Sequence, residues 1–407
     1  MNYIIRNCEK LVKKLEKMYG AVLITGPRRT GKTTFCKNYK KSLPLLNFDD
    51  FTLRESVNIS PNSFFLDNKL PLILDEIQRV PQIFLQVKYE LDKADKKGQV
   101  FMTGSQAFSL MKNVSESLAG RIGIVTLLGL SQKEKFGIDF YEPFLPTDSY
   151  IKKCKNIHID YDEIWQQILL GGMPELFANN EITDRKLYWS NYIATYVERD
   201  VREISNIIDT TKFAKFISLL AAECGSLLNY TNIANDLNLT VPTIEKYISI
   251  LETSQIIYLL KPYSNNLSKR LIKTPKVYFF DTGLLCHLLH WNTIETLRNG
   301  AMAGHILENY VISEILKGYY NSGDNNTPLY YYRDKDKKEI DLIIEQDGTL
   351  YPIEIKKHAD PKVDDAKNFS ALDKFTNIKI GPGAIISFYD KVLHITDNVI
   401  NIPISYL

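Results

Sequence analysis

Eight consecutive residues near the N-terminus have the composition of a phosphate-binding loop. The segment Gly26-Pro27-Arg28-Arg29-Thr30-Gly31-Lys32-Thr33 fits the pattern GxxxxGK followed by Ser or Thr, and it lies between an apolar run and a helical pattern. Backbone N–H groups of such a loop can surround phosphate oxygens at a helix N-terminus. We therefore expect an ATP site at residues 26–34, Thr34 included, with Lys32 on the β- and γ-phosphates and Thr33 on Mg²⁺. The alternative is an ordinary strand–turn–helix with a surface lysine.

A pair of carboxylates follows the second apolar run. The segment LILDE at 72–76 places Asp75 and Glu76 at the expected carboxyl end of a buried strand, 43 residues after Lys32. Ligands bind at that end of the strands in open α/β sheets. We expect Asp75 to hold Mg²⁺, largely through water, and Glu76 to orient or deprotonate the attacking water.

Two further groups could contact the transferred phosphate. The third apolar run ends in TGSQ, where Ser105, or Thr103 as second choice, would sense the γ-phosphate; a simple strand-end turn is the alternative. Arg121 ends the segment SLAGR and could stabilise phosphoryl-transfer charge, in the same chain or across an oligomer interface. The alternative for Arg121 is a helix C-terminal arginine favoured by the helix dipole.

The C-terminal quarter carries a second set of chemically capable residues. Asp341 lies in EIDLIIE and Glu354 and Lys356 lie in PIEIKK, with an Asp-Gly turn signal between the two segments. An antiparallel hairpin would bring the three together, two carboxylates for Mg²⁺ or Mn²⁺ and a lysine to position or activate water. The alternatives are a solvated hairpin whose charges pair, Glu354 with Lys356 or Lys357, and an inactive nuclease-like fold used for binding.

These motifs together resemble a known family. GPRRTGKTT, LDEIQRVP, TGSQ, SLAGR, GGMPE and YVERDV, with the later YFFDTGLL and EIDLII…PIEIKK, are similar to bacterial and archaeal AAA-type P-loop ATPases whose C-terminal half is a domain of unknown function. The resemblance implies a helical lid, a winged helix and a PD-(D/E)XK nuclease-like fold. It also implies that Gly172-Met173-Pro174 contacts the nucleotide base and that Glu308 is a further metal ligand. Residue 340 is Ile where the nuclease pattern has Pro.

The elements that must position these residues follow from hydrophobic periodicity. Apolar strands alternating with helical patterns predict a parallel α/β sheet, a P-loop NTPase core, over 1–160. We expect a helical lid at 161–210, a winged helix at 211–285 and a restriction-endonuclease-like α/β unit at 286–407. In the winged helix, Thr240, Thr243 and Lys246 would face a DNA groove. The basic wing would contact phosphates through Lys269, Arg270, Lys273 and Lys276.

Charge and composition limit the partners. The net charge of +2 hides a split, because residues 300–407 hold 12 Lys or Arg against 16 Asp or Glu, which leaves the basic surplus to the rest. Five dispersed cysteines without a CxxC pair predict no disulfide framework and no Cys-based zinc site, and they favour a cytoplasmic location. No apolar run reaches the roughly 20 residues of a membrane span. We expect no membrane partner.

Two hypotheses of function remain open from the sequence. The first is an Mg²⁺-dependent ATPase coupled to a module that binds or cleaves nucleic acid, with DNA favoured over RNA. The second is a nucleotide-switched regulatory ATPase whose nuclease-like domain docks a protein partner without cutting. A homo-oligomer is compatible with both, since Arg121 could complete a neighbouring subunit's site.

Overall fold

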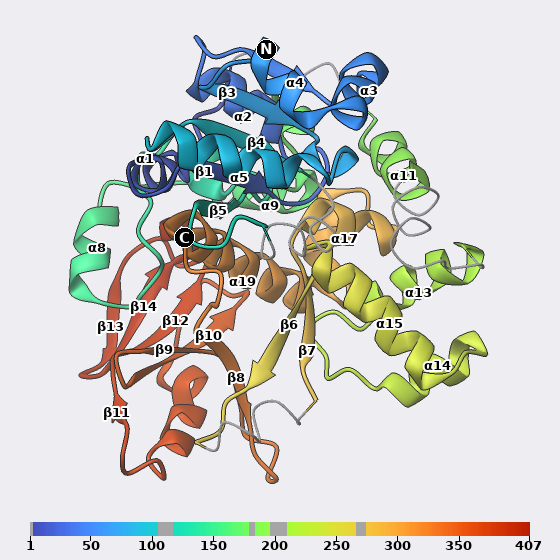
Figure 1. The fold of residues 1–407 in the computed structure, drawn as a ribbon. Helices are drawn as coiled ribbons and strands as arrows, with labels where there is room; N and C mark the ends of the chain where they lie inside the picture. Colours follow the sequence, from blue (N-terminus) through green and yellow to red (C-terminus); the bar gives the residue numbers. More distant parts are fainter. Residues whose placement is uncertain (1–2, 105–116, 179–183, 196–209, 266–273) are drawn as a thin grey trace.

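The structure is a computed structural model that describes residues 3–104, 117–178, 184–195, 210–265 and 274–407. Two sheets organise it, an N-terminal parallel sheet and a C-terminal mixed sheet, with the long helix α19 (Ala303–Ser322) between them (Figure 1). Among the described residues, no helix is both long and apolar enough to span a bilayer.

The N-terminal sheet is parallel throughout, as the alternation of strands and helices predicts. Its order is β2-β3-β4-β1-β5, so that β4 lies between β1 and β3, the strands that lead into the glycine-rich loop and the carboxylate pair. Every residue of β1, β3 and β4 is buried, and most of these residues are apolar. The strands are β1 (Ala21–Thr25), β2 (Leu45–Asn47), β3 (Leu72–Asp75), β4 (Val100–Thr103) and β5 (Ile122–Thr126).

Among the described residues, five helices and one 3₁₀ turn accompany this sheet. Local signals set where several begin: the side chain of Asp50 accepts hydrogen bonds from the first-turn N–H groups of α3, and Ser60 does so for α4. The elements are α1 (Glu9–Met18), α2 (Lys32–Tyr39), α3 (Phe51–Ile59), α4 (Pro61–Asp67), η1 (Ile77–Arg79) and α5 (Ile83–Ala94).

Helices dominate the middle of the chain, as predicted. Three of them, α13, α14 and α15, precede an antiparallel hairpin of β6 and β7, which is the order of elements expected for a winged helix. The elements are α7 (Gln132–Lys135), α8 (Asp148–Cys154), α9 (Tyr161–Leu170), α10 (Pro174–Ala178), α11 (Arg185–Thr195), α13 (Thr210–Ala222), α14 (Tyr230–Leu237), α15 (Val241–Thr253), β6 (Ile257–Pro262) and β7 (Lys276–Phe279).

The C-terminal sheet runs in the order β13-β14-β12-β10-β9-β8-β6-β7, with β11 paired to β10. The predicted hairpin is confirmed: β9 and β10 are antiparallel, and Asp347 and Gly348 take the left-handed conformation that a tight turn needs. Its further elements are α17 (Thr282–Leu288), α18 (Ile294–Asn299), β8 (Leu329–Arg333), β9 (Glu339–Gln346), β10 (Thr349–Lys356), η3 (Val363–Leu372), β11 (Lys379–Ile380), β12 (Gly383–Ser387), β13 (Leu393–Thr396), β14 (Val399–Pro403) and η4 (Ile404–Tyr406).

The hairpin β6–β7 belongs to the C-terminal sheet as well as to the three helices. Strand β6 pairs in parallel with β8, so backbone hydrogen bonds continue from the predicted winged helix into the predicted nuclease-like unit. The boundary expected between 285 and 286 also falls inside α17. A movement of the unit formed by α13, α14 and α15 would therefore be transmitted to the C-terminal sheet.

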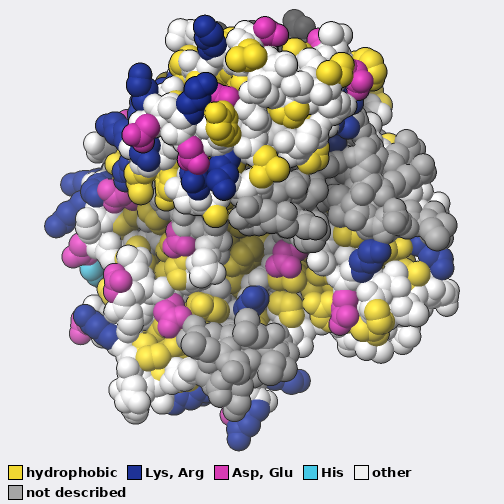
Figure 2. Space-filling view, in the orientation of Figure 1, with side chains coloured by type: hydrophobic (Ala, Val, Ile, Leu, Met, Phe, Trp, Pro, Cys, Tyr) yellow, Lys and Arg dark blue, Asp and Glu magenta, His cyan; other side chains and the backbone are white. Residues whose placement is uncertain are grey.

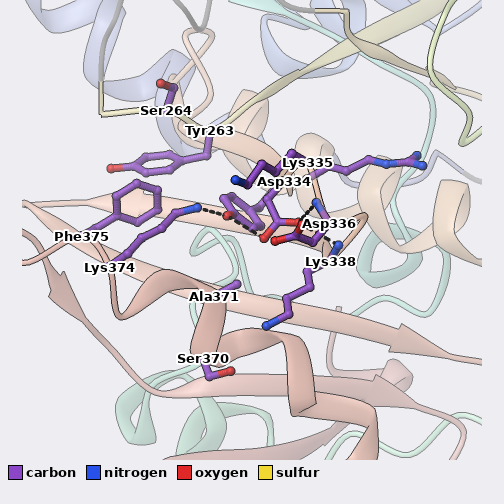
Figure 3. Close-up of a pocket in the computed structure, with 12 residues that line it drawn as sticks. Tyr263, Ser264, Asp334, Lys335, Asp336, Lys338, Ser370, Ala371, Lys374 and Phe375 are labelled. Atoms are coloured by element: carbon purple, nitrogen blue, oxygen red, sulfur yellow. Dashed lines mark hydrogen bonds between the residues drawn. The ribbon is translucent and has the colours of Figure 1, made fainter.

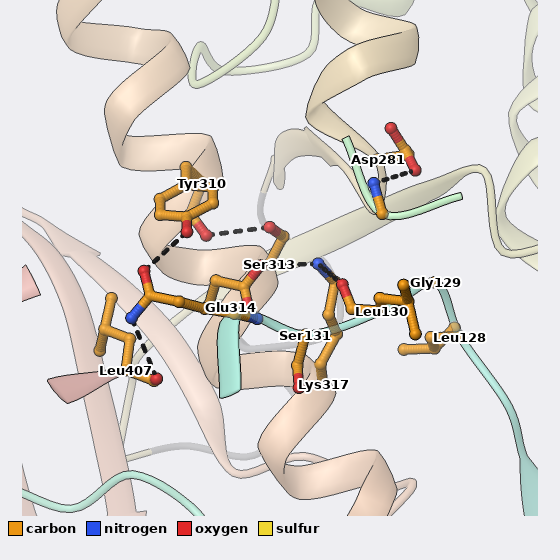
Figure 4. Close-up of polar contacts among 12 residues, drawn as sticks. Leu128, Gly129, Leu130, Ser131, Asp281, Tyr310, Ser313, Glu314, Lys317 and Leu407 are labelled. Atoms are coloured by element: carbon orange, nitrogen blue, oxygen red, sulfur yellow. Dashed lines mark hydrogen bonds and ion pairs between the residues drawn. The ribbon is translucent and has the colours of Figure 1, made fainter. Parts of the chain in front are cut away.

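A buried polar network joins the N-terminal unit to α19 and the C-terminus (Figure 4). The backbone N–H of Gln132 donates to Oε2 of Glu314 at 2.7 Å, and Nζ of Lys317 lies 2.7 Å from Oε1 of the same carboxylate. The side-chain amide of Gln132 donates to the carbonyl of Leu407 at 3.3 Å and accepts from the hydroxyl of Tyr310 at 2.7 Å. Because all these groups are buried, their hydrogen bonds are needed to offset desolvation.

Part of the basic surplus lies on α1. Figure 2 shows Lys and Arg side chains gathered over this helix, with Asp and Glu side chains among them. Lys10 pairs with Asp139 at 3.0 Å and Lys13 with Glu9 at 2.8 Å. Exposed pairs of this kind contribute little stability, and their mutual neutralisation weakens the case for this face as a phosphate-binding surface.

Candidate functional site

The glycine-rich segment forms a tight loop between β1 and α2, as predicted. Gly26 has φ +136°, and a Cβ built on it would lie 2.3 Å from the carbonyl oxygen of Leu127. Gly31 has φ +88° and caps the N-terminus of α2. Both positions therefore require glycine, the first because of close backbone packing and the second because of its left-handed conformation.

Lys32 points into this loop. Its side chain is buried, and its Nζ donates to the carbonyl oxygens of Gly26 at 3.1 Å and Pro27 at 2.7 Å. The hydroxyl of Thr30 also donates to the carbonyl of Pro27, at 3.0 Å. The loop thus encloses the ammonium group, as a phosphate-binding lysine requires.

A buried arginine that the motif analysis missed supports the loop from behind. Arg6 donates to the carbonyl oxygens of Thr30 at 2.9 Å and Leu128 at 2.7 Å, and pairs with Glu134 at 3.1 Å. Burial lowers the pKa of Arg6, but the charge of Glu134 and its hydrogen bond, together with the effects of Cys8 and Tyr3, outweigh burial and raise the pKa above its usual value. No local signal could have found Arg6, since its partners lie up to 128 positions away.

The carboxyl end of β3 meets the loop at Asp75. This residue is 1% exposed, and its Oδ1 accepts a hydrogen bond from Oγ1 of Thr33 at 2.8 Å and another from the hydroxyl of Thr103. Burial raises the pKa of Asp75, although the hydrogen bonds from the two threonines favour its charged form. A hydroxyl and a carboxylate in contact are hard oxygen ligands, so the pair fits the Mg²⁺ expected there.

Glu76 follows Asp75 in a left-handed conformation with φ 55°. Its backbone N–H donates to the hydroxyl of Thr103 at 3.2 Å, and its carboxylate accepts from the amide of Gln78 at 2.5 Å. Thr103, at the end of β4, therefore contacts both Asp75, the predicted Mg²⁺ ligand, and Glu76, the predicted catalytic residue. Ser105, the first choice for a γ-phosphate sensor, lies outside the described residues.

The predicted lid residues lie against the loop. The Cγ of Pro174 is 3.9 Å from the position of a Cβ built on Gly31, and Arg29 pairs with Glu175 at 2.8 Å. Arg29 itself has φ 62° and is exposed; Arg28 is half-buried, and Thr34 is exposed on the first turn of α2.

The segment before Pro174 is held by a residue that the motif analysis did not select. Oδ2 of Asp281 accepts from the backbone N–H of Gly172 at 2.9 Å, while Oδ1 caps α17 through the N–H groups of Gly283 and Leu284. The carbonyl of Gly172 accepts from Leu130 at 2.6 Å. The cap could have been read from Asp-Thr-Gly before a helical run, but its contact with Gly172 could not.

Arg121 does not lie near the phosphate loop of its own chain. It precedes β5, and its carbonyl accepts from the N–H of Ala21, so it lies at the amino end of β1, whereas the phosphate loop follows Thr25 at the carboxyl end. Its guanidinium pairs with both carboxylate oxygens of Asp92, at 2.6 and 3.0 Å. The expectation of a role within the same chain is therefore wrong, because parallel strands separate the two ends. A role across a subunit interface stays a prediction.

The predicted DNA-contacting residues are only partly described. Thr240 caps α15 through the N–H of Thr243, and Lys246 is exposed on the same helix. Lys269, Arg270 and Lys273, like Arg199 and Asp200 of the YVERDV motif, lie outside the described residues. Lys276 was expected to contact phosphates from the wing, and this expectation is wrong: its side chain is 4% exposed.

The C-terminal hairpin brings Asp341, Glu354 and Lys356 to one region. Oδ2 of Asp341 accepts from the backbone N–H of Ile355 at 2.9 Å, and Nζ of Lys356 lies 2.7 Å from Oε1 of Glu354. Glu308 extends from α19, and its Oε1 accepts from Nζ of Lys276 at 3.2 Å and from the hydroxyl of Tyr278 at 2.5 Å.

The electrostatics of this region show that the carboxylates interact. Burial, and then the charge of Glu308, raises the pKa of Asp341. Burial and the charge of Asp341 likewise raise the pKa of Glu354. Burial lowers the pKa of Lys276, but Glu308, Asp341 and Glu339 together raise it above its usual value.

The arrangement does not fit a bound metal ion as it stands. Within the described part of the chain, no three acidic, His or Cys side chains are placed to hold one cation. Glu308 is engaged by Lys276 and Glu354 by Lys356. The pairing of Glu354 with Lys356 is the one that the sequence offered as an alternative to metal binding.

A cavity of about 570 Å³ lies beside the β8–β9 turn (Figure 3). Three aromatic rings and four basic side chains line it, together with Asp334 and Asp336. Nζ of Lys374 lies 4.8 Å from the ring centroid of Tyr332 and 5.4 Å from that of Phe375. The aromatic and basic residues are Tyr263, Tyr332, Phe375, Arg333, Lys335, Lys338 and Lys374.

Relatives of this chain occur in bacteria and archaea. An uncharacterized protein of Mycobacterium tuberculosis is 27% identical over 383 residues, covering 94% of this chain and 79% of its own length. An uncharacterized protein of Methanocaldococcus jannaschii is 26% identical over 341 residues, covering 79% of this chain and 71% of the relative.

Solved structures resemble the chain more distantly. A Walker-type ATPase of Pyrococcus abyssi aligns with a TM-score of 0.45 and 15% identity, over 70% of this chain and 96% of that one. RuvB of Thermotoga maritima aligns with a TM-score of 0.31 and 16% identity, over 62% and 88%.

Family models divide the chain into three parts. Residues 161–295 and 303–407 match two models that are each described as a domain of unknown function. Residues 19–136 match the model described as an AAA domain. This match agrees with the strand order and the loop geometry above, and residues 19–136 are an AAA-type P-loop ATPase domain.

Proposed function

We propose that this chain is an Mg²⁺-dependent ATPase that couples ATP binding and hydrolysis to a nucleic-acid-binding module in its C-terminal half, with DNA as the favoured nucleic acid. The contact between Thr33 and Asp75 carries the ATPase part. It joins the end of the phosphate loop to the carboxylate of β3, which is the arrangement that nucleotide-bound Mg²⁺ requires.

The residues of the loop and of the neighbouring strand ends would have different roles in phosphoryl transfer. Lys32 would exchange its carbonyl partners for the β- and γ-phosphates, while Thr33 and Asp75 would hold Mg²⁺. When bound, Mg²⁺ neutralises charge that develops on the phosphate oxygens. Glu76 would orient the attacking water, and Thr103 positions both carboxylate residues from β4.

The experiment for this part is steady-state ATP hydrolysis by the full chain. Lys32→Ala should lower kcat by at least 100-fold, because the phosphate charge then lacks its ammonium partner. Lys41→Ala, an exposed lysine beyond α2, is the matched control and should hydrolyse ATP like the wild type. Normal turnover by Lys32→Ala would refute the assignment of the phosphate site.

Two sets of contacts support coupling between the nucleotide and the C-terminal half. Pro174 lies against Gly31, and Gly172 of the same segment is bonded to Asp281 at the start of α17. The network around Gln132 and Glu314 connects the end of the ATPase domain to α19. A change in the loop on nucleotide binding therefore has a short covalent and hydrogen-bonded route to the C-terminal sheet.

A second candidate function is a nucleotide-switched regulatory ATPase whose C-terminal domain docks a protein partner without cutting. The observation that favours it is the engagement of Glu308 by Lys276 and of Glu354 by Lys356. Incubation of labelled DNA and RNA with the protein, ATP and Mn²⁺, followed by measurement of both binding and cleavage, separates the two. Binding, or cleavage that Asp341→Ala abolishes, would support the first function, whereas nucleic acid that is neither bound nor cut would favour the second.

A further inference from the structure

One lysine occupies the centre of the acidic region in the C-terminal sheet. Lys276 is the first residue of β7, and its side chain is 4% exposed. Its Nζ lies 2.6 Å from Oε1 of Glu339 on β9 and 3.2 Å from Oε1 of Glu308 on α19. A single ammonium group thus bridges a strand and a helix that approach it from different directions.

A further carboxylate acts on the same ammonium group. Asp341 lies two positions beyond Glu339 on the same strand, and its charge acts on Lys276. Glu354 is 7% exposed; Oε1 pairs with Lys356, but Oε2 is buried and accepts no hydrogen bond in the described part of the chain. A buried carboxylate oxygen without a donor is costly and marks an unfilled position for a cation or a donor.

The positive charge of Lys276 balances part of the negative charge of the buried carboxylates around it. Buried carboxylates are stable in their charged form only beside cations, either a bound divalent ion or a side chain. Lys276 delivers one positive charge from within the fold, on the hairpin that also belongs to the three-helix unit. A divalent ion that used Glu308 as a ligand would have to take the oxygen that Lys276 and Tyr278 now share.

We propose that the ammonium of Lys276 is a built-in cation that competes with Mg²⁺ or Mn²⁺ for Glu308 and Asp341, so that the acidic site is closed to divalent metal while Lys276 is inserted. This inference rests on the sequence-based prediction that Asp341, Glu354 and Glu308 are metal ligands. It makes the position of β7, rather than the metal concentration alone, decide whether the site fills.

The test is Mn²⁺ binding to the full chain without nucleotide, measured by the electron paramagnetic resonance signal of free Mn²⁺. Lys276→Met should bind Mn²⁺ with a Kd at least tenfold lower than the wild type. Lys276→Met combined with Asp341→Asn should lose this gain. The matched control is Lys261→Met, an exposed lysine on the neighbouring strand β6, which should bind Mn²⁺ like the wild type.

A second variant controls for the possibility that Lys276→Met fails to fold. Lys276→Met combined with Glu339→Gln removes one positive and one negative charge together, and Glu339 is not a proposed metal ligand. It should fold and show the same gain in Mn²⁺ affinity, and its thermal unfolding should shift upward on addition of Mn²⁺.

The outcomes separate this inference from the proposed function. Asp341-dependent Mn²⁺ binding that is equally tight in the wild type and in Lys276→Met would overturn the role of Lys276 and leave the metal ligands in place. Absence of Asp341-dependent binding in every variant would overturn both. Neither result touches the ATPase, which Lys32→Ala tests separately.

Discussion

At the scale of single residues, several charged side chains of this chain are buried, where the loss of hydration costs free energy. Lys32, Lys276 and Asp75 are each compensated by partners within hydrogen-bond distance. Lys135 is also buried, on the short helix α7 that leaves the ATPase domain, and burial there disfavours its charged form. Burial, and then the charge of Lys317, lowers the pKa of Lys135 to about 8.

Replacing Lys135 should therefore stabilise the protein in a pH-dependent way. In the unfolded chain a lysine has a pKa of about 10.4, so between pH 8 and that value the unfolded state holds more protons. The free energy of unfolding of the wild type should rise with pH across this range. Lys135→Met should show a smaller rise, because buried Lys133, whose pKa is also lowered to about 8, remains, and it should be more stable at pH 7 by roughly 3 kcal/mol at most.

The measurement is the urea-unfolding midpoint of both proteins from pH 7 to pH 10. Lys17→Met, an exposed lysine on α1, serves as the control and should follow the wild type at every pH. A stability difference between Lys135→Met and the wild type that does not change with pH would contradict the depressed pKa.

At the scale of elements, the turn between β8 and β9 holds lysine side chains exposed to solvent. Oδ1 of Asp334 accepts from the backbone N–H groups of Asp336 at 2.9 Å and Lys338 at 3.0 Å, which fixes the turn. Lys335 and Lys338 are consequently exposed at the mouth of the aromatic cavity. Basic side chains beside aromatic rings are typical of surfaces that bind single-stranded nucleic acid.

Removing both lysines should weaken nucleic-acid binding in a salt-dependent manner. Lys335→Ala combined with Lys338→Ala should raise the Kd for a single-stranded DNA oligonucleotide about tenfold at low salt. The slope of log K against log salt should fall by about 1.4, since each phosphate contact on a single strand contributes about 0.7.

Fluorescence anisotropy of a labelled oligonucleotide at several salt concentrations measures both quantities. Lys96→Ala combined with Lys97→Ala, two exposed lysines of the ATPase domain, is the control with the same charge change. An unchanged slope in the turn variant would remove this turn from the proposed interface.

At the scale of the whole molecule, a buried ion pair holds the ATPase domain to the C-terminal half. Glu314 and Lys317 of α19 are nearly inaccessible to solvent, and their partners are the N–H of Gln132 and the carbonyl of Leu130. Both partners lie in the segment that leads out of the ATPase domain. The connection is therefore polar at its centre and specific in its geometry.

Removing one partner of this ion pair should lower the free energy of unfolding much more than replacing both partners. Glu314→Ala leaves the ammonium of Lys317 buried without its carboxylate, and we expect a loss of about 3–5 kcal/mol in unfolding free energy. Glu314→Leu combined with Lys317→Met replaces the pair by apolar groups and should cost clearly less. Urea unfolding of the three proteins measures this; equal losses in both variants would show that the pair is not coupled.

The sequence by itself determined what is local in this protein. The glycine loop, the buried strand before Asp75, the alternation of strands and helices and the Asp-Gly hairpin of β9 and β10 all follow from spacing and turn chemistry within short segments. These signals sufficed to predict the parallel sheet and to assign Thr33 and Asp75 to one site.

Only the tertiary structure decided what depends on distant segments. It placed Arg121 at the amino ends of the parallel strands, Arg6 behind the phosphate loop, Asp281 against Gly172, and Lys276 among carboxylates instead of at a surface wing. The reason is physical: a charged residue has the same sequence signature on the surface and in the core. Whether it is paired and buried is set by segments that the chain brings together only on folding.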